Sequence, residues 1–303
     1  MKQEDFKILS LDIIETVREY VNSYVNGCCD NTVGCFFGWR EFYGVKYLIE
    51  DNILFIQYNQ PDGEYAYASP IPLSGHVEDF VKGVEKLRQM HLEAGDSQFV
   101  LVTVTEPEII ALQEAYAGQM TFYADEDSFD YVYSSQDLMF FKGKKYHGER
   151  NHVNKFKKTY SGYKFIPLEG DLIQKSYEFC MEYVRNNPKT ADTAIAEYKK
   201  IPEFFENFHK YDFLGGCLIV DDKIIGVCLA EKIKDTLFEH FEKCDSSYPG
   251  AHQALVSEMA IMFASDVTYI NREDDAGDLN LRKSKLSYHP VKMVTKHVVN
   301  IKC

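Results

Sequence analysis

The sequence has 303 residues, of which 45% are hydrophobic and 26% charged, a composition typical of a globular protein with a substantial core. Lysine and arginine total 33 against 47 aspartate and glutamate residues, so the formal net charge is −14. An acidic chain of this kind is a poor candidate for broad, nonspecific binding of nucleic acid, although it can still carry a local basic patch.

Hydrophobic periodicity predicts helices and strands that alternate along the chain. In the first half we expect helices over 11–25, 76–94 and 107–118, strands over 99–104 and 129–133, and a hairpin over 45–58. In the second half we expect helices over 144–160, 172–186, 192–209 (interrupted near Pro202) and 251–264, strands over 236–241 and 267–271, and a hairpin over 217–230. The fold class is therefore α/β or α+β with a mixed sheet.

Charge and an internal repeat both divide the chain into two halves. Residues 1–135 hold 8 bases and 23 acids, whereas residues 136–303 hold 25 bases and 24 acids. Residues 48–56 and 218–227 each read as two strands joined by a tight acidic turn, at Asp51-Asn52 and Asp221-Asp222. Two copies of one α/β unit would explain this repeat, although acidic hairpins are also common by chance.

Several classes of protein lose support because their signatures are absent. No apolar run reaches the ~18 residues of a membrane span, and the first residues lack the pattern of a signal peptide, so we expect a cytoplasmic protein. The eight cysteines form no Cys-x-x-Cys pair, which favours reduced, buried thiols over a metal site. No P-loop, dinucleotide-binding, serine-hydrolase or zinc-protease motif occurs.

The segment 142–158 is unusually basic for so acidic a chain, with seven bases and one acid. Aromatic and apolar residues recur in it at helical spacing, so a helix could dock through them and expose its basic face. Such a face suits the phosphates of RNA, coenzyme A or anionic lipid, although a charged helix can also be merely solvated. The candidate residues are Lys144, Lys145, His147, Arg150 and Asn151.

The segment 239–253 places a strand end, a loop and a helix start in succession. Alternation along the strand predicts that His240 and Glu242 share one face, so either could act as a general base, while His240 could equally be structural. Lys243 and Tyr248 are candidate binding residues, and Gly250 would let a ligand approach the backbone near the helix N-terminus.

The polar segment 271–289 follows a predicted strand and would lie beside 239–253 if the two strands are adjacent. Its candidate binding residues are Asn271, Arg272, Glu273, Arg282 and Lys285. The cationic ones could hold a phosphate or carboxylate, although ordinary surface ion pairs would give the same pattern.

Several long strings resemble a bacterial family of unassigned function that is related to the C-terminal domain of phosphatidylglycerol lysyltransferases. The strings are F-F-G-W-R-E-F-Y (36–43), F-D-Y-V-Y-S (129–134), the run from Leu138 to Phe156, F-E-K-C-D-S-S-Y-P-G-A-H-Q-A (241–254) and the run from Tyr269 to Pro290. The resemblance implies tandem GCN5-like acyltransferase folds similar to the Fem-type peptidyltransferases, each a mixed, mostly antiparallel sheet flanked by helices. The domains would be 1–135 and 136–303, with the active site in the second.

The same resemblance implies transfer of an acyl or aminoacyl group to an amine or hydroxyl of a small molecule or lipid headgroup. The donor would be aminoacyl-tRNA, whose acceptor end the basic segment would contact, and acyl-CoA remains an alternative donor. Glu242 or His240 would handle the proton, and backbone N–H groups near Gly250 would stabilise the oxyanion. A module without catalytic activity that binds a small anionic metabolite or a protein partner is the competing hypothesis.

Overall fold

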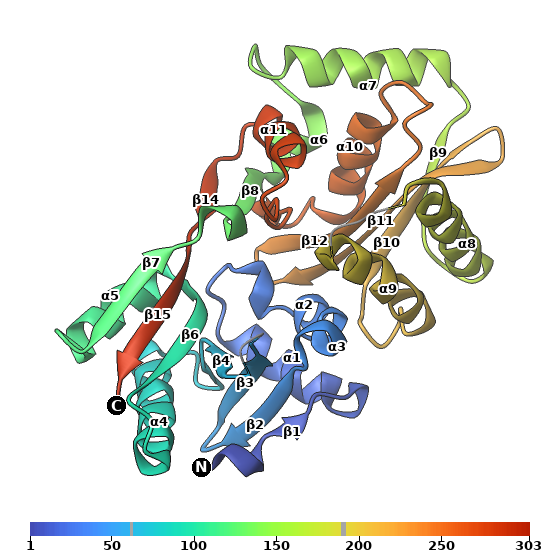
Figure 1. The fold of residues 1–303 in the computed structure, drawn as a ribbon. Coiled ribbons are helices and arrows are strands. Elements are labelled where there is room, and N and C mark those ends of the chain that lie inside the picture. Colours follow the sequence, from blue (N-terminus) through green and yellow to red (C-terminus); the bar gives the residue numbers. More distant parts are fainter. Residues whose placement is uncertain (61–62, 189–191) are drawn as a thin grey trace. The chain divides into compact units, whose positions relative to one another are not determined.

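The computed structural model describes residues 1–60, 63–188 and 192–303, which form two compact units (Figure 1). Unit 1 comprises Met1–Asp130 together with Val294–Cys303, and unit 2 comprises Tyr131–Met293. These units differ from the expected halves because the final strand, β15 (Lys296–Lys302), pairs with β6 (Gln98–Thr105) and β7 (Met120–Ala124) of unit 1. Unit 2 is thus inserted into unit 1.

Unit 1 is built on a mixed sheet with the strand order β1-β2-β3-β4-β6-β15-β7, and β5 pairs with β3. The other strands are β1 (Lys7–Ile8), β2 (Lys46–Glu50), β3 (Ile53–Asn59), β4 (Tyr65–Ala68) and β5 (Ile71–Pro72). The helices are α1 (Ile14–Ser23), α2 (Val33–Gly38), α3 (Arg40–Tyr43), α4 (Val77–Ala94) and α5 (Glu106–Ala115), with short 3-10 turns η1 (Gln3–Asp5), η2 (Leu11–Ile13), η3 (Cys29–Asn31) and η4 (Glu126–Ser128). The strands pair antiparallel except β4 and β6, which are parallel.

Unit 2 is built on a second mixed sheet with the order β14-β8-β13-β12-β11-β10-β9. Its strands are β8 (Asp130–Ser134), β9 (Lys164–Pro167), β10 (Leu214–Val220), β11 (Lys223–Ile233), β12 (Thr236–Cys244), β13 (Tyr269–Asn271) and β14 (Lys292–Val294). Its helices are α6 (Ser135–Phe140), α7 (His147–Thr159), α8 (Asp171–Asn186), α9 (Asp192–Glu206), α10 (Ala251–Phe263) and α11 (Leu279–Ser287). Among the described helices, none is both long and apolar enough to cross a bilayer.

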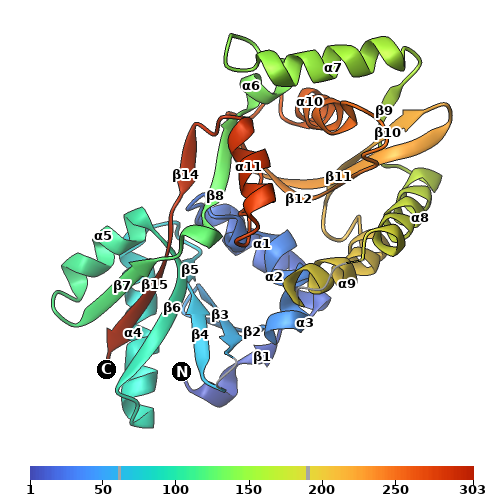
Figure 2. The same ribbon diagram turned by 45° about the horizontal axis from the view of Figure 1, so that its top comes forward.

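Helices cover both faces of the unit 2 sheet (Figures 1 and 2). On one face, Cys228 and Ala230 of β11 belong to the core cluster that includes the apolar side of α10. Because neighbouring residues of a strand face opposite sides, Phe241 of β12 points the other way, where its ring contacts Phe205 of α9. The sequence therefore buries β11 and β12 on both faces.

Residues at the chain turns explain the two hairpins and the start of helix α5. Asp51-Asn52 and Asp221-Asp222 adopt the positive φ angles that two-residue hairpin turns need, so both expected hairpins are confirmed. α5 begins with a capping box between Thr105 and Glu108, next to Pro107.

One expected interruption is absent, and several elements were not anticipated. α9 continues through Pro202, since the buried residues Ile201 and Phe204 pack its last turns despite the missing N–H. Sequence patterns did not indicate α2, α3, α6, α11, β4, β5, β7, β9, β14 or β15, which are mostly short. Periodicity cannot be recognised over so few residues.

A buried lysine fixes β15 within unit 1. The Nζ of Lys296 lies 2.5 Å from an Asp30 carboxylate oxygen and 2.6 Å from one of Asp130, and its side chain is 2% exposed. A buried ammonium is stable only when opposite charges surround it, because burial removes its hydration. The two carboxylates raise the pKa of Lys296 against the effect of burial and hold its charge.

We expect Lys296→Met to lower the free energy of unfolding by about 3–5 kcal/mol, because it leaves the buried carboxylate of Asp130 and the partly exposed one of Asp30 without their cation. Lys302→Met, at an exposed position of the same strand, serves as the control and should change it by less than about 0.5 kcal/mol. Urea unfolding of both variants measures the difference, and equal effects would contradict this account of Lys296.

Candidate active site

Arg272 joins two neighbouring strands of unit 2 through a pair of glutamates. β12 and β13 run parallel and adjacent, which brings Arg272, the residue after β13, beside β12. Its Nε lies 2.6 Å from Glu239 Oε2, and its Nη2 lies 2.8 Å from Glu242 Oε2. The ring of Tyr288 lies 5.1 Å from the guanidinium carbon and covers the group. The expected adjacency of the two polar segments is therefore present.

A β-bulge decides which side chains of β12 meet Arg272. Leu229 of β11 pairs with Phe241, whereas the next residue, Ala230, pairs with Glu239, so His240 is an extra residue in β12. The extra residue shifts the alternation and places Glu239 and Glu242 together. The prediction that His240 and Glu242 share one face is wrong for this reason.

The two glutamates carry different charges because they share one cation. Burial, followed by the nearby charge of Glu242, raises the pKa of Glu239 above its ordinary value, although Arg272 opposes the change. Burial also acts against ionisation of Glu242, but Arg272 and a hydrogen bond from His252 lower its pKa well below the ordinary range. Near neutral pH, Glu242 is the ionised member and Glu239 retains its proton longer.

His252, near the start of α10, connects Glu242 to the surface. Its Nδ1 lies 3.1 Å from Glu242 Oε1, and its side chain is 46% exposed. Its Nε2 has no hydrogen-bond partner among the described residues. An ionised carboxylate can only accept, so it fixes the proton on Nδ1 and leaves the Nε2 lone pair available. Sequence reasoning missed His252 and Glu239, because nothing in the sequence marks the bulge that aligns them.

His240 is held on both sides of its ring. Its Nδ1 lies 2.7 Å from Glu273 and its Nε2 lies 2.8 Å from Glu231, and the side chain is 1% exposed. Although burial opposes ionisation, the hydrogen bond and charge of His240 lower the pKa of Glu273 to about 2. Because both ring nitrogens contact carboxylates, neither is open to a substrate proton. His240 therefore bridges Glu231 and Glu273 within the fold.

The other candidates after β13 are bound to groups of the protein itself. Lys285 Nζ donates to the carbonyl oxygens of Arg272, at 2.6 Å, and of Asp274. Arg282 forms a bidentate pair with Asp275, at 2.7 Å for both bonds. The buried Asn271 accepts the backbone N–H of Glu273 through its Oδ1. These contacts shape the loop between β13 and α11.

The loop before α10 is closed by packing. Gly250 has φ +87°, and a Cβ at this position would overlap the carbonyl oxygen of His152 in α7. The ring of Tyr248 packs against that of Tyr160, 5.4 Å away. The close approach of α7 therefore accounts for a glycine at position 250. Lys243 is likewise engaged, 2.6 Å from Glu197 of α9.

The basic segment docks as its spacing predicts. Tyr146, Val153 and Phe156 are buried in the core cluster of unit 2, and the basic side of α7 is exposed. Some candidate residues are occupied: Arg150 donates to the carbonyls of Phe141 and Gly143, Lys145 pairs with Asp137, and Asn151 bonds His147. Within this described segment, Lys144, Lys155 and Lys158 are exposed and form no ion pair.

A separate cavity of about 470 Å³ lies between the start of α8 and the end of α9. It is lined by Gly170, Ile173, Gln174, Phe205, Glu206, Asn207, Phe208, His209 and Lys210. None of the residues proposed from the sequence borders it. Its lining mixes buried aromatic rings with exposed polar groups and defines no reaction.

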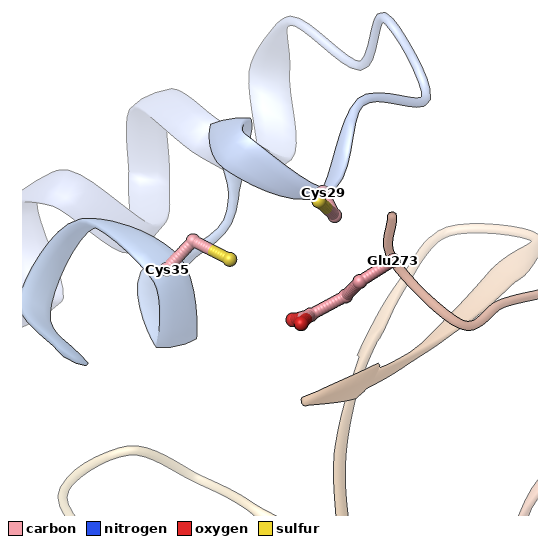
Figure 3. Close-up of side chains that lie close together, drawn as sticks. All are labelled: Cys29, Cys35 and Glu273. Carbon is pink, nitrogen blue, oxygen red and sulfur yellow. The ribbon is translucent and has the colours of Figure 1, made fainter. Parts of the chain in front are cut away.

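No disulfide joins the cysteines, and seven of the eight are buried. In unit 1, Cys29 Sγ lies 3.1 Å from an Asp130 carboxylate oxygen, and burial raises the pKa of the thiol. Figure 3 shows Cys29 on η3 and Cys35 on α2; its third labelled side chain, Glu273, belongs to unit 2. A buried, protonated thiol is a poor nucleophile, so we assign Cys29 no chemistry.

Comparisons with known proteins relate the chain to one family. Residues 22–300 match the family model described as "Phosphatidylglycerol lysyltransferase, C-terminal". An uncharacterized protein from Mycoplasmoides gallisepticum is 25% identical over 181 residues, and the match spans 59% of this chain and 58% of that relative. A conserved protein of unknown function from Bacteroides thetaiotaomicron is 28% identical, with a TM-score of 0.90 and full coverage of both chains.

More distant solved structures share the fold alone. L-PGS from Bacillus licheniformis is 12% identical with a TM-score of 0.66, covering 94% of this chain and 90% of that one. FemX is 7% identical with a TM-score of 0.64, covering 97% and 96%. The expected resemblance to these two groups, and the expected pair of mixed sheets flanked by helices, are confirmed.

The unequal charge states of the two glutamates can be tested by amide substitution. Glu239→Gln mimics the protonated form without the need to take up a proton on folding, so it should leave the free energy of unfolding at neutral pH unchanged or raise it. Glu242→Gln removes the ionised partner of the largely buried Arg272 and should cost about 3 kcal/mol. Urea unfolding gives both values, and the reverse order would refute the assignment.

The raised pKa of Glu239 also predicts a pH dependence. Wild-type stability should fall as the pH rises from the ordinary pKa of a glutamate to the raised pKa of Glu239, because the folded state binds the proton more tightly than the unfolded state over this interval. Glu239→Gln should abolish this fall.

The structural role of Gly250 gives a second matched pair. Gly95→Ala introduces a side chain at a similar φ of +86° with open space around it, whereas Gly250→Ala also collides with α7. Both should destabilise the protein through backbone strain of about 1 kcal/mol, and Gly250→Ala should cost about 2 kcal/mol more. Thermal unfolding measures the difference. Equal losses would restore the interpretation that Gly250 serves a ligand.

Proposed function

We propose a function that starts from the family, since the chain belongs to the phosphatidylglycerol lysyltransferase C-terminal domains. The protein is an acyltransferase that moves an aminoacyl group from aminoacyl-tRNA to an amine or hydroxyl. The observation that carries this proposal is the chain of contacts from half-exposed His252 to largely buried, ionised Glu242 and then to Arg272. An imidazole oriented by a carboxylate is a standard general base. Of the two proton-handling residues named from the sequence, Glu242 keeps a role, as the group that orients the base.

The reaction follows from these roles. His252 Nε2 takes the proton of the acceptor amine or hydroxyl as its nitrogen or oxygen attacks the ester carbonyl of the donor. The bond between the carbonyl carbon and the ribose oxygen of the tRNA then breaks, and the protonated His252 returns the proton to that oxygen. Glu242 stabilises the imidazolium that forms between the two steps, while Arg272 keeps Glu242 ionised.

The basic side of α7 supports an anionic donor. Lys144, Lys155 and Lys158 are exposed on or beside this helix, and α7 packs against the start of α10 where His152 approaches Gly250. A polyanion held by these lysines would therefore lie on the helix that adjoins the segment bearing His252. Binding through phosphates weakens steeply as salt is raised, because the released counterions are then less diluted.

Transfer from radiolabelled lysyl-tRNA tests the proposal, with phosphatidylglycerol vesicles and soluble amines offered as separate acceptors. We expect His252→Gln and Glu242→Gln to lower the rate by about 10²–10⁴-fold, with donor affinity unchanged. His76→Gln, at an exposed position of unit 1, is the control and should keep full activity.

Two outcomes would replace this function. If lysyl-tRNA binds and is never consumed with any acceptor, the protein is a binding module. If tRNA binding is undetectable and coenzyme A raises the melting temperature, the donor is an acyl-CoA, since a ligand of the native state stabilises it.

A further inference from the structure

The sheet of unit 1 ends in a strand that lacks the usual protection of a sheet edge. β7 (Met120–Ala124) pairs with β15 on one side and is the last strand in the order. Its sequence, M-T-F-Y-A, contains no charge and no proline, although the flanking region is strongly acidic. Phe122 is 41% and Tyr123 59% exposed. Natural edge strands are normally interrupted by lysine, proline or a bulge, because an open edge recruits another strand.

Hydrogen bonds at both ends of β7 show which backbone groups are available. The carbonyl of Gln119 accepts from Lys302 N, and the N–H of Asp125 donates to the carbonyl of Lys296. Backbone groups alternate in direction along an antiparallel strand, so the odd-numbered residues between these two also face β15. Met120, Phe122 and Ala124 therefore direct their N–H and C=O groups to the open edge.

We propose that β7 is a dimerisation edge that pairs antiparallel with β7 of a second copy of this chain, with Phe122 on the two-fold axis. In this register Phe122 forms a hydrogen-bonded pair with its counterpart, and Met120 pairs with Ala124. Thr121 then lies opposite Tyr123. Aromatic–aromatic and aromatic–β-branched neighbours are the cross-strand pairs that stabilise sheets most.

The distribution of charge around β7 favours antiparallel pairing with a second copy of the chain. The acidic run Asp125-Glu126-Asp127 follows β7 directly, whereas Ala117, Gly118 and Gln119 precede it without charge. An antiparallel pair of identical strands places each acidic run opposite the uncharged residues of the other copy. A parallel pair would align acid with acid, which is destabilising. The same strand thus supplies a compatible partner in one orientation only, and the two-fold pair uses the β7 edge of both copies.

Sedimentation velocity of the whole chain over a range of concentrations tests the proposal. A five-residue edge buries less than the roughly 800 Å² per partner of a standard interface, so we expect a dimer that dissociates on dilution. Tyr123→Lys, at a largely exposed site, should shift the protein to monomer by placing a charge in each half of the interface. Ile110→Lys, on α5 of the same unit and 53% exposed, is the control and should leave the dimer intact.

Disulfide cross-linking tests the proposed register of the two β7 strands. Paired residues in a hydrogen-bonded antiparallel position lie about 5.5 Å apart between Cα atoms, which a disulfide can span. Phe122→Cys should therefore cross-link two copies under mild oxidation, and Ile110→Cys should not. A wild type that is monomeric at every concentration would overturn the proposal. So would a dimer that withstands Tyr123→Lys, or one that Phe122→Cys fails to cross-link.

Discussion

The sharing of one guanidinium between two glutamates sets the charge states of the candidate site in unit 2. Arg272 can neutralise one negative charge, yet it lies within hydrogen-bonding distance of both Glu239 and Glu242. Two buried carboxylates cannot both ionise against a single cation, so the pair divides into a protonated and an ionised member. That division also orients His252, because an ionised carboxylate accepts the Nδ1 proton and leaves Nε2 as the hydrogen-bond acceptor. The strand pairing and the covering ring of Tyr288 both keep Arg272 in place.

Much of the framework of the fold is readable from short-range sequence patterns. The acidic corners at Asp51-Asn52 and Asp221-Asp222 each demand positive φ, and both form the expected turns. The apolar spacing of Tyr146, Val153 and Phe156 correctly indicates the side on which α7 is buried. These features depend on neighbours within one or two turns of chain, which is the range over which a sequence pattern carries physical information.

The candidate site was harder to predict because its geometry depends on contacts between distant segments. One extra residue in β12 places Glu239, and not His240, on the same face as Glu242. No residue type in the sequence predicts such a bulge. Gly250 shows a related ambiguity, since a glycine before a helix fits a bound ligand or an approaching helix equally well. Arg282 and Lys285 are cations on α11, and their partners are a carboxylate and carbonyls of the loop before that helix. Residue type identified the right segments and could not assign the individual roles.

The position of β15 has a consequence for the order in which the protein can be made. A ribosome releases β6 and β7 early, then all of unit 2, and only afterwards the strand that lies between them in the sheet. Until then the sheet of unit 1 lacks the strand between β6 and β7, and Asp30 and Asp130 have no ammonium to pair with. Unit 2 has its whole chain available first, which reverses the usual sequence in which N-terminal domains fold before later ones. The nascent chain must therefore keep an incomplete acidic sheet in solution throughout the synthesis of unit 2, and its surplus negative charge, which repels other chains, suits it to that interval.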